Sequence, residues 1–187
     1  MTPDIIQAEA AEMDGFEGRI PYIYLDTNGV PTCGKGHALF SQANALLLPW
    51  QINGQPATPQ QIAADYQAVK AAEPGHTAAH YEPLTVCRLT DADIDGRCGV
   101  DLGARWNRLL THFPQAGEYP PPSVLALADL CFNLGGDFPP KWPKLAAAVL
   151  ANDWAACAIQ SHRAPPIGAD RNAYVAALFR SAVQPGA

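Results

Sequence analysis

The most constraining feature of this 187-residue chain is a nearly continuous apolar stretch at residues 124–132. Prolines at positions 120–122 break the chain just before it, and Ser123 follows them as a candidate helix cap. The stretch predicts a helix, and a helix that is apolar on all sides has to be buried. A chain of this length buries roughly 70% of its unfolded surface, which is enough to enclose such a helix. We therefore expect a globular protein with a proper core.

Helical patterns also cover much of the remaining sequence. Thr58 and Pro59 form a cap-plus-proline start, and Thr90 with Asp93 three residues later forms a variant of the capping box. Apolar residues recur at helical spacing after each of these starts. The further predicted helices lie at residues 3–17 with Gly18 as their stop, 59–73, 89–109, 144–150, 153–161 and 170–182.

A change of pattern near the N-terminus predicts β-structure. Residues 20–25 resemble a strand, the Asn-Gly pair at 28–29 is a strong signal for a hairpin turn, and residues 30–33 form the returning strand. Glycines flank Lys35 on both sides, which indicates a close approach of the backbone to a neighbouring group there. Together these patterns predict an α+β fold that is mostly helical, with a small N-terminal β-hairpin.

The charge balance excludes some classes of function. Twelve Lys and Arg against eighteen Asp and Glu give a formal net charge of -6. This argues against a general nucleic-acid binder, which needs a basic face to neutralise phosphates. No run approaches the roughly 18 apolar residues of a membrane span, so no stable membrane insertion is expected. Residues 1–12 lack the basic start and apolar core of a secretory signal, so we expect synthesis in the cytoplasm without a signal peptide.

The cysteines and two short motifs bear on metal binding. The five cysteines are odd in number and have no C-x-x-C spacing, which favours buried thiols in a reducing compartment over a disulfide or zinc framework. His76 and His80 have the spacing of a zinc pair but lack an obvious third ligand. Residues 91–96 begin like a calcium loop, but Leu102 stands at position twelve, so a capped helix is favoured. No metal site is predicted.

The candidate catalytic residues are Glu17, Asp26 and Thr32. Eight residues separate the two acids, and five separate Asp26 from the threonine. If the first helix ends near Gly18 and the hairpin folds back, all three side chains can face one cleft. Two carboxylates across a groove are the usual means of cleaving a glycosidic bond, because one donates a proton and the other activates water. A hydroxyl such as that of Thr32 can hold this water in place.

The run from Glu17 to His37 resembles the catalytic segment of the phage-type lysozymes, the endolysins of glycoside hydrolase family 24. That family carries a Glu, eight residues, an Asp or Cys, five residues and a Thr, followed by Gly-x-Gly-His. Every one of these spacings is present here. Residues 132–135 resemble the family's Asn-x-Gly turn on its buried central helix, residues 151–156 resemble a helix that opens after a loop, and Arg171 resembles its C-terminal arginine.

The resemblance implies a glycoside hydrolase that cleaves the β-1,4 bond between N-acetylmuramic acid and N-acetylglucosamine in peptidoglycan. In family terms Glu17 is the proton donor, while Asp26 and Thr32 position the attacking water. The outcome is inverting if the two carboxyl groups lie about 6.5–9.5 Å apart. No metal or organic cofactor is implied, because acid catalysis and an ordered water suffice.

The resemblance also implies a lysozyme-like fold with two lobes and a cleft between them. Residues 1–187 then form a single catalytic domain, with the hairpin in a small lobe at about 14–85 and a larger helical lobe at about 86–182. Residues 38–84 are longer than in compact relatives and have no counterpart, so we assign this insertion to the small lobe or the rim of the groove.

Four further residues support the site in this interpretation. His37 is expected to fix the hairpin through hydrogen bonds rather than to act as an acid or base. Asn133 serves either the buried turn or a contact to sugar, and Gly135 completes that turn. Arg171 corresponds to the arginine that reaches back to the catalytic glutamate in the family.

Two biological settings and one non-catalytic alternative remain open. The expected partners are the glycan strands of the periplasmic cell wall, and the protein is expected to be a monomer. It would reach the wall either through holin lesions as a phage endolysin or through a secretion system as an antibacterial effector with an immunity protein. The negative charge is unlike that of many wall-degrading lysozymes, which makes the effector a serious option. The alternative is an inactive peptidoglycan-binding or inhibitor module of the same fold.

Overall fold

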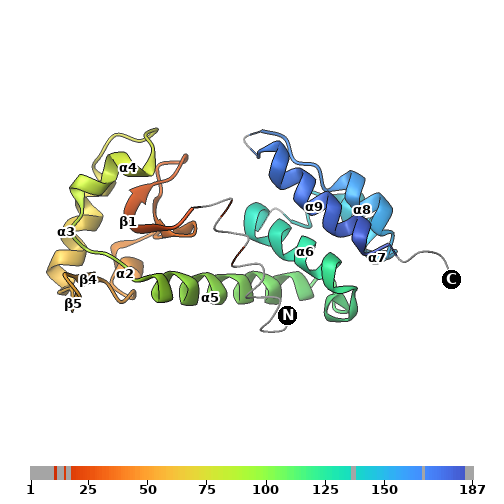
Figure 1. The fold of residues 1–187 in the computed structure, drawn as a ribbon, viewed down its shortest axis with the longest axis horizontal. Coiled ribbons are helices and arrows are strands. Elements are labelled where there is room, and N and C mark those ends of the chain that lie inside the picture. The colour runs from red at the N-terminus through yellow and green to blue at the C-terminus, as the bar shows by residue number, and fades with distance from the viewer. Residues whose placement is uncertain (1–10, 12–14, 16–17, 136–137, 166, 184–187) are drawn as a thin grey trace. The chain divides into compact units, whose positions relative to one another are not determined.

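The computed structural model describes residues 11, 15, 18–135, 138–165 and 167–183, and the fold is α+β (Figure 1). The chain divides into two compact units, which we call the hairpin unit (residues 12–99) and the helical unit (residues 1–11 and 100–187). Helix α5 (Asp91–Leu110) contributes to both units. The division therefore falls within this helix, after Gly99, whereas the sequence suggested a lobe boundary near residue 86.

The predicted hairpin is present and carries a third strand. Strand β1 (Ile20–Leu25) pairs with β2 (Pro31–Gly34), and β2 pairs with β3 (His37–Ala38), in one antiparallel sheet of order β1-β2-β3. Strand β3 was not predicted from the sequence. The two glycines that flank Lys35 have φ angles of 61° and 74°, which only glycine adopts readily, and they allow the tight turn from β2 into β3.

A second, two-stranded sheet was not predicted from the sequence either. It consists of β4 (Gln51–Ile52) and β5 (Gln55–Pro56), joined through Asn53 and Gly54. These two turn residues have φ angles of 51° and 76°, as a two-residue hairpin turn with positive φ at both central positions requires. The signal was the same Asn-Gly pair that predicted the first hairpin.

The segment 38–84 is an integral part of the hairpin unit. Its helical elements are α2 (Gln42–Ala45), α3 (Pro59–Lys70), α4 (Ala78–Tyr81) and the 3-10 turn Glu82–Leu84. Helix α3 starts with the predicted cap, because the Thr58 hydroxyl and the Gln61 side chain satisfy each other's backbone N–H groups. The core of the unit joins this segment to the hairpin; its members include Ile23, Leu25, Cys33, Trp50, Ile62, Tyr66, Val69 and Tyr81.

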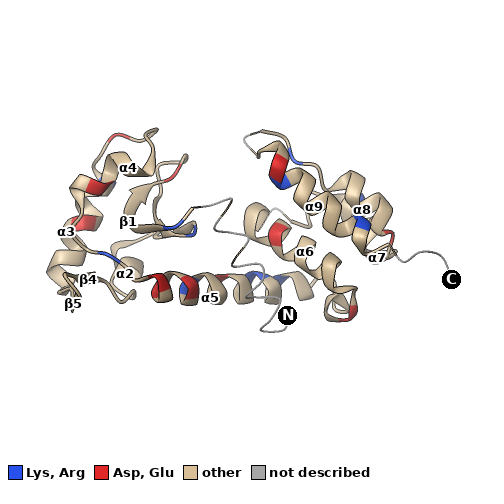
Figure 2. Ribbon diagram, viewed as in Figure 1, with Lys and Arg blue, Asp and Glu red and all other residues tan. Residues whose placement is uncertain are grey.

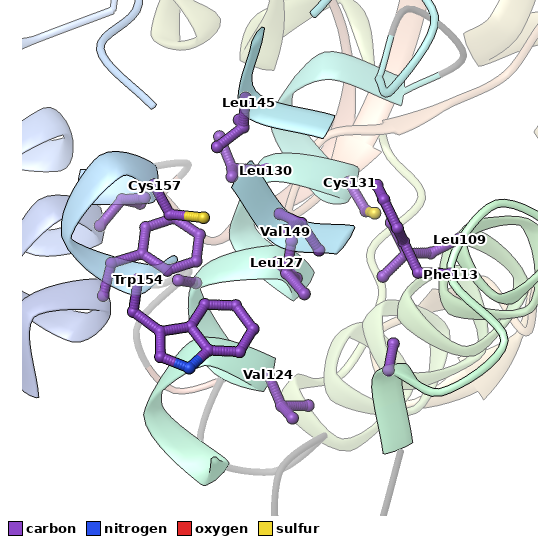
Figure 3. Packing of buried hydrophobic residues seen from close by; sticks show 14 of the residues in the cluster. Leu109, Phe113, Val124, Leu127, Leu130, Cys131, Leu145, Val149, Trp154 and Cys157 are labelled. Atoms are coloured by element: carbon purple, nitrogen blue, oxygen red, sulfur yellow. The ribbon is translucent and has the colours of Figure 1, made fainter. Parts of the chain in front are cut away.

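The helical unit surrounds the apolar stretch as expected. That stretch lies in α6 (Pro121–Leu134). The described part of the chain after α5 also holds α7 (Pro143–Leu150), α8 (Trp154–Gln160) and α9 (Ala169–Ser181), with a 3-10 turn at Ala116–Glu118. Figure 3 shows Leu127 and Leu130 of α6 facing Val149 and Leu145 of α7. Burial of such side chains contributes about 1.5–3 kcal/mol each, so this interior is the main source of stability in the unit.

One predicted cap is wrong. Ser123 does not precede α6 but lies fully buried inside its first turn, where its hydroxyl donates to the carbonyl oxygen of Pro120 at 2.7 Å. The helix starts at Pro121 because the fixed φ of proline suits the first helical positions. At these positions the backbone N–H has no partner within the helix, so its absence in proline costs no hydrogen bond. Among the described residues, no helix is long and apolar enough to cross a membrane.

All five cysteines are buried, as the sequence analysis expected. Burial is the main cause that raises the pKa of Cys87, Cys131 and Cys157 to about 12 in each case. The thiolate is the reactive form of cysteine, so these side chains are chemically inert at neutral pH.

We therefore expect the native protein to react with a thiol reagent such as DTNB only as fast as it unfolds. In denaturant, all five cysteines should react promptly. The measurement is the rate of absorbance increase under mildly alkaline conditions with and without denaturant. Rapid reaction of Cys87, Cys131 or Cys157 in the folded protein would contradict the burial described above.

Candidate active site

The register of the hairpin places the candidate residues of β1 and β2 on one face. Tyr24 lies opposite Thr32 in the pairing, and the backbone N–H of Asp26 donates to the carbonyl oxygen of Val30 at 3.0 Å. Because side chains alternate along a strand, these four residues project from the same side of the hairpin. Leu25 projects from the opposite side into the core of the unit.

Asp26 is fixed by the turn that follows it. Its Oδ1 accepts hydrogen bonds from the backbone N–H groups of Asn28 and Val30, both at 2.8 Å. The N–H of Gly29 donates to the Asp26 carbonyl oxygen at 3.0 Å, and this glycine has a φ of 72°. The turn therefore occupies Oδ1 twice, whereas Oδ2 has no hydrogen-bond partner among the described residues.

Thr32 and Asp26 both form hydrogen bonds with Val30. Its side chain is buried, and its hydroxyl donates to the carbonyl oxygen of Val30 at 2.9 Å. Val30 therefore donates its N–H to the Asp26 carboxylate and accepts the Thr32 hydroxyl at its carbonyl oxygen. Since the hydroxyl proton is already committed, Thr32 Oγ1 can only accept a hydrogen bond from a bound molecule such as water.

Glu17, the predicted proton donor, lies outside the described residues. The chain after it begins with Gly18, which has a φ of 71°; the predicted helix at 3–17 that this glycine would end lies outside the described residues, apart from positions 11 and 15. Arg19 then anchors the chain to α5 within the hairpin unit. Its guanidinium donates to the carboxylate of Asp95 at 2.8 Å and to the carbonyl oxygen of Asp91 at 3.2 Å.

The same carboxylate holds a buried lysine that the sequence analysis did not assign. Lys35 Nζ lies 2.8 Å from Asp95 Oδ1, and only 1% of the lysine side chain is exposed. A Cβ at Gly34 would lie 3.5 Å from Ile94, so the turn between β2 and β3 does approach α5 closely, as the glycines indicated. Figure 2 shows the mixed acidic and basic residues along this helix.

Asp95 therefore clamps both ends of the candidate site segment. It binds Arg19, two positions after the predicted proton donor, and Lys35, three positions after Thr32. The hydrogen bond from Lys35, followed by that from Arg19, holds the pKa of Asp95 below its usual value. The sequence signal for this clamp was a lysine between two glycines together with an acidic helix start.

His37 lies on β3, half-buried, and pairs in register with Cys33 of β2. This position is in keeping with the structural role expected of it. His76 and His80 are stacked, with 3.9 Å between ring centroids, and within the described part of the chain no group of three His, Cys, Asp or Glu side chains could hold a metal ion. The calcium-like run is the capped start of α5, where the Asp93 carboxylate accepts the backbone N–H of Thr90 at 3.1 Å.

The other predicted site residues belong to the helical unit, where they surround a buried acid. Arg171 Nε donates to Asp129 Oδ2 at 2.8 Å, and Arg163 Nη1 donates to Asp129 Oδ1 at 2.7 Å. Arg163 also donates to the side-chain oxygen of Asn133 at 3.2 Å, which favours the buried-turn role over the sugar contact for this asparagine. Gly135 follows α6 with a φ of 56°. The predicted contact of Arg171 with the catalytic glutamate lies outside the described residues.

Asp129 was not predicted from the sequence as a buried, paired acid. It is fully buried in the middle of the apolar stretch, and Asn172 completes its surroundings by accepting the N–H groups of Arg163. A lone acid in an otherwise apolar helix was the available signal, because a buried charge has to be paired. Its partners follow 34 and 42 positions later, which no local pattern reveals.

Comparison with known proteins identifies no family for this chain. No model of a protein family matches the sequence. No curated protein matches it either. The interpretation of the site therefore rests on the geometry given above and on the residue spacing.

The Asp95 clamp predicts a pH dependence of stability. A carboxyl whose pKa is lower in the folded state stabilises fully above its unfolded pKa of about 3.9, and this stabilisation is lost as the pH falls through the folded pKa. Asp95→Asn should lower the unfolding free energy at neutral pH and flatten its decline in acid. Urea unfolding of both proteins over a pH series measures this. Equal acid slopes would show that Asp95 is not the anchor.

Asp129→Asn should destabilise the protein by about 3–5 kcal/mol, because it keeps the volume but leaves two buried arginines without their shared carboxylate. Asp170→Asn, at an exposed acid of the same unit, is the matched control and should change stability by less than about 1 kcal/mol. Urea midpoints at constant slope give both values. Similar effects of the two substitutions would contradict the structural role of Asp129.

Proposed function

We propose that this protein is a muramidase that hydrolyses the β-1,4 bond between N-acetylmuramic acid and N-acetylglucosamine. The observation that carries the proposal is the pair Asp26 and Thr32, which project from one face of the hairpin and are both bonded to Val30. The Glu17-to-His37 spacing, which resembles that of the phage-type lysozymes, supplies the proton donor.

In this mechanism Asp26 and Thr32 hold the attacking water. The water donates one hydrogen bond to Asp26 Oδ2 and the other to Thr32 Oγ1, which leaves an oxygen lone pair for the anomeric carbon. Because the turn amides of Asn28 and Val30 donate to Oδ1, Oδ2 is the oxygen that accepts the proton of the water as the new bond forms. The rigid hairpin spares the site the cost of ordering these groups during the reaction.

Glu17 donates its proton to the leaving glycosidic oxygen in the same step. The carbon–oxygen bond to the leaving sugar breaks as the bond to water forms, so the new reducing end has the opposite configuration. Asp95, which binds Arg19 and Lys35, acts as a positioning residue for the segments that carry both acids. One proton donor and one base account for the whole reaction.

The proposal includes a lysozyme-like fold, with the hairpin unit as its small lobe and the helical unit as its larger lobe. Its partners are glycan strands of the bacterial cell wall. The protein acts there as a monomer, after release through membrane lesions as an endolysin or after delivery by a secretion system as an effector matched by an immunity protein.

Three conservative substitutions test the assignment of roles. Glu17→Gln and Asp26→Asn should each lower turnover of purified peptidoglycan by about 100-fold or more, because each removes one proton-transfer group. Thr32→Val, which keeps the shape, should lower kcat while KM changes little, because it removes an acceptor for the water rather than for the sugar. The measurements are the loss of turbidity and the release of reducing N-acetylmuramic acid ends.

Asp170→Asn is the matched control, because it makes the same change at an exposed acid of the helical unit and should leave turnover intact. Circular dichroism and unfolding midpoints show whether each variant is folded. Full activity in folded Glu17→Gln would overturn the proton-donor role. Binding to peptidoglycan without any release of ends by the wild-type protein would favour the non-catalytic wall-binding module instead.

A further inference from the structure

The helical unit carries a surface groove that the proposed chemistry does not use. Two hollows, of about 330 and 540 Å³, share Pro120, Asn152 and Trp154 in their walls. The larger one is lined in addition by Gln115, Glu118, Tyr119 and Pro121. We call the two hollows together the 120/154 groove.

Three polar side chains of this groove are available to a ligand, whereas Asp153 in the smaller hollow accepts the N–H of Ala156 and caps α8. Gln115, Glu118 and Asn152 are exposed, and within the described part of the chain their side chains have no hydrogen-bond or ion-pair partner. The hydroxyl of Tyr119 has none among the same residues. Trp154 packs in the core of the unit with 7% of its surface exposed, and its indole N–H has no hydrogen-bond partner among the described residues.

The apolar part of the groove is rigid. The rings of Tyr119 and Trp154 meet edge-to-face with 5.1 Å between centroids, and Trp154 is stacked against Phe179 at 6.3 Å. The prolines of the wall have fixed φ angles. Asn152 has a φ of 54°, a conformation that asparagine tolerates better than most residues, and it holds its amide at the junction of the two hollows.

We propose that the 120/154 groove binds a saccharide of N-acetylhexosamine units. A sugar ring presents C–H groups that pack on aromatic and proline surfaces, together with hydroxyls that need both donors and acceptors. The carboxylate of Glu118 accepts from hydroxyls, the indole N–H of Trp154 donates to them, and the amide of Asn152 does both, as an N-acetyl group also requires. No Lys or Arg lines the groove, and Glu118 repels phosphates, so nucleic acids and other polyanions do not fit.

The proposal stands on the groove itself and does not depend on muramidase activity. If the proposed function holds, the groove is a second binding site for the glycan strand, outside the hairpin unit that carries Asp26 and Thr32. It would then raise the local concentration of substrate without taking part in the bond cleavage.

The test is an NMR titration of full-length, ¹⁵N-labelled Glu17→Gln protein with tetra-N-acetylchitotetraose. The four tryptophan indole signals are first assigned through Trp→Phe variants. The Trp154 signal should shift and saturate at millimolar saccharide. Those of Trp106, which is buried, and Trp50, whose indole N–H donates to the Ala45 carbonyl oxygen at 2.8 Å, should stay in place.

Asn152→Gly removes the amide while glycine tolerates the positive φ, and it should weaken binding about fivefold to tenfold through the lost hydrogen bonds. Asn53→Gly is the matched control, because it makes the same change at a φ of 51° in the hairpin unit and should leave the affinity unchanged. A muropeptide prepared from peptidoglycan is titrated in parallel, so that a binder of cell-wall glycan is distinguished from one of chitin-type sugar alone.

The proposal is overturned if the Trp154 signal stays in place at millimolar saccharide. It is equally overturned if Asn152→Gly leaves the affinity unchanged. Because the titration is read from Trp154 in a Glu17→Gln background, its outcome is independent of the turnover assay. Failure of one proposal is therefore distinguishable from failure of the other.

Discussion

The hydrogen bonds between the Asp26 carboxylate and the backbone of the turn after it are the interaction on which this account depends. They fold the hairpin and, at the same time, fix the direction of the acid and leave Oδ2 without a partner among the described residues. Val30 extends the arrangement to Thr32 through its carbonyl oxygen. One turn therefore sets both groups that would hold the attacking water. Substitutions that loosen the turn should harm the site before they harm the fold.

Buried or half-buried charge pairs tie each unit together in its own way. In the hairpin unit, Asp95 joins Arg19 and Lys35, so that the segments before β1 and after β2 are both held by α5. In the helical unit, Asp129 joins two arginines across α6 and α9 and the loop before it. Such pairs add little net stability, because desolvation offsets the attraction, but losing one member is costly. Their effect is to define a single arrangement of the elements that carry them.

Local sequence patterns predicted helix caps and a hairpin correctly, whereas contacts between residues far apart in the sequence were not predicted. The caps at Thr58 and Thr90 and the first hairpin follow from residues within four positions of one another, and the structure confirms them. The turn at 53–54 carried the same local signal and was overlooked. Ser123 was misassigned because two consecutive prolines already start that helix. The partners of Asp129 were beyond reach, since ion pairing across more than thirty residues is set by the packing of helices and leaves no spacing rule in the sequence.

The configuration of the first product tests the central claim most directly. Purified peptidoglycan is digested and followed by ¹H NMR before mutarotation, because under the proposed mechanism a water held by Asp26 and Thr32 attacks from the face opposite the leaving group. The account predicts new N-acetylmuramic acid reducing ends that form in the α configuration. Ends that form first in the β configuration, or anhydro ends formed without water, would contradict it.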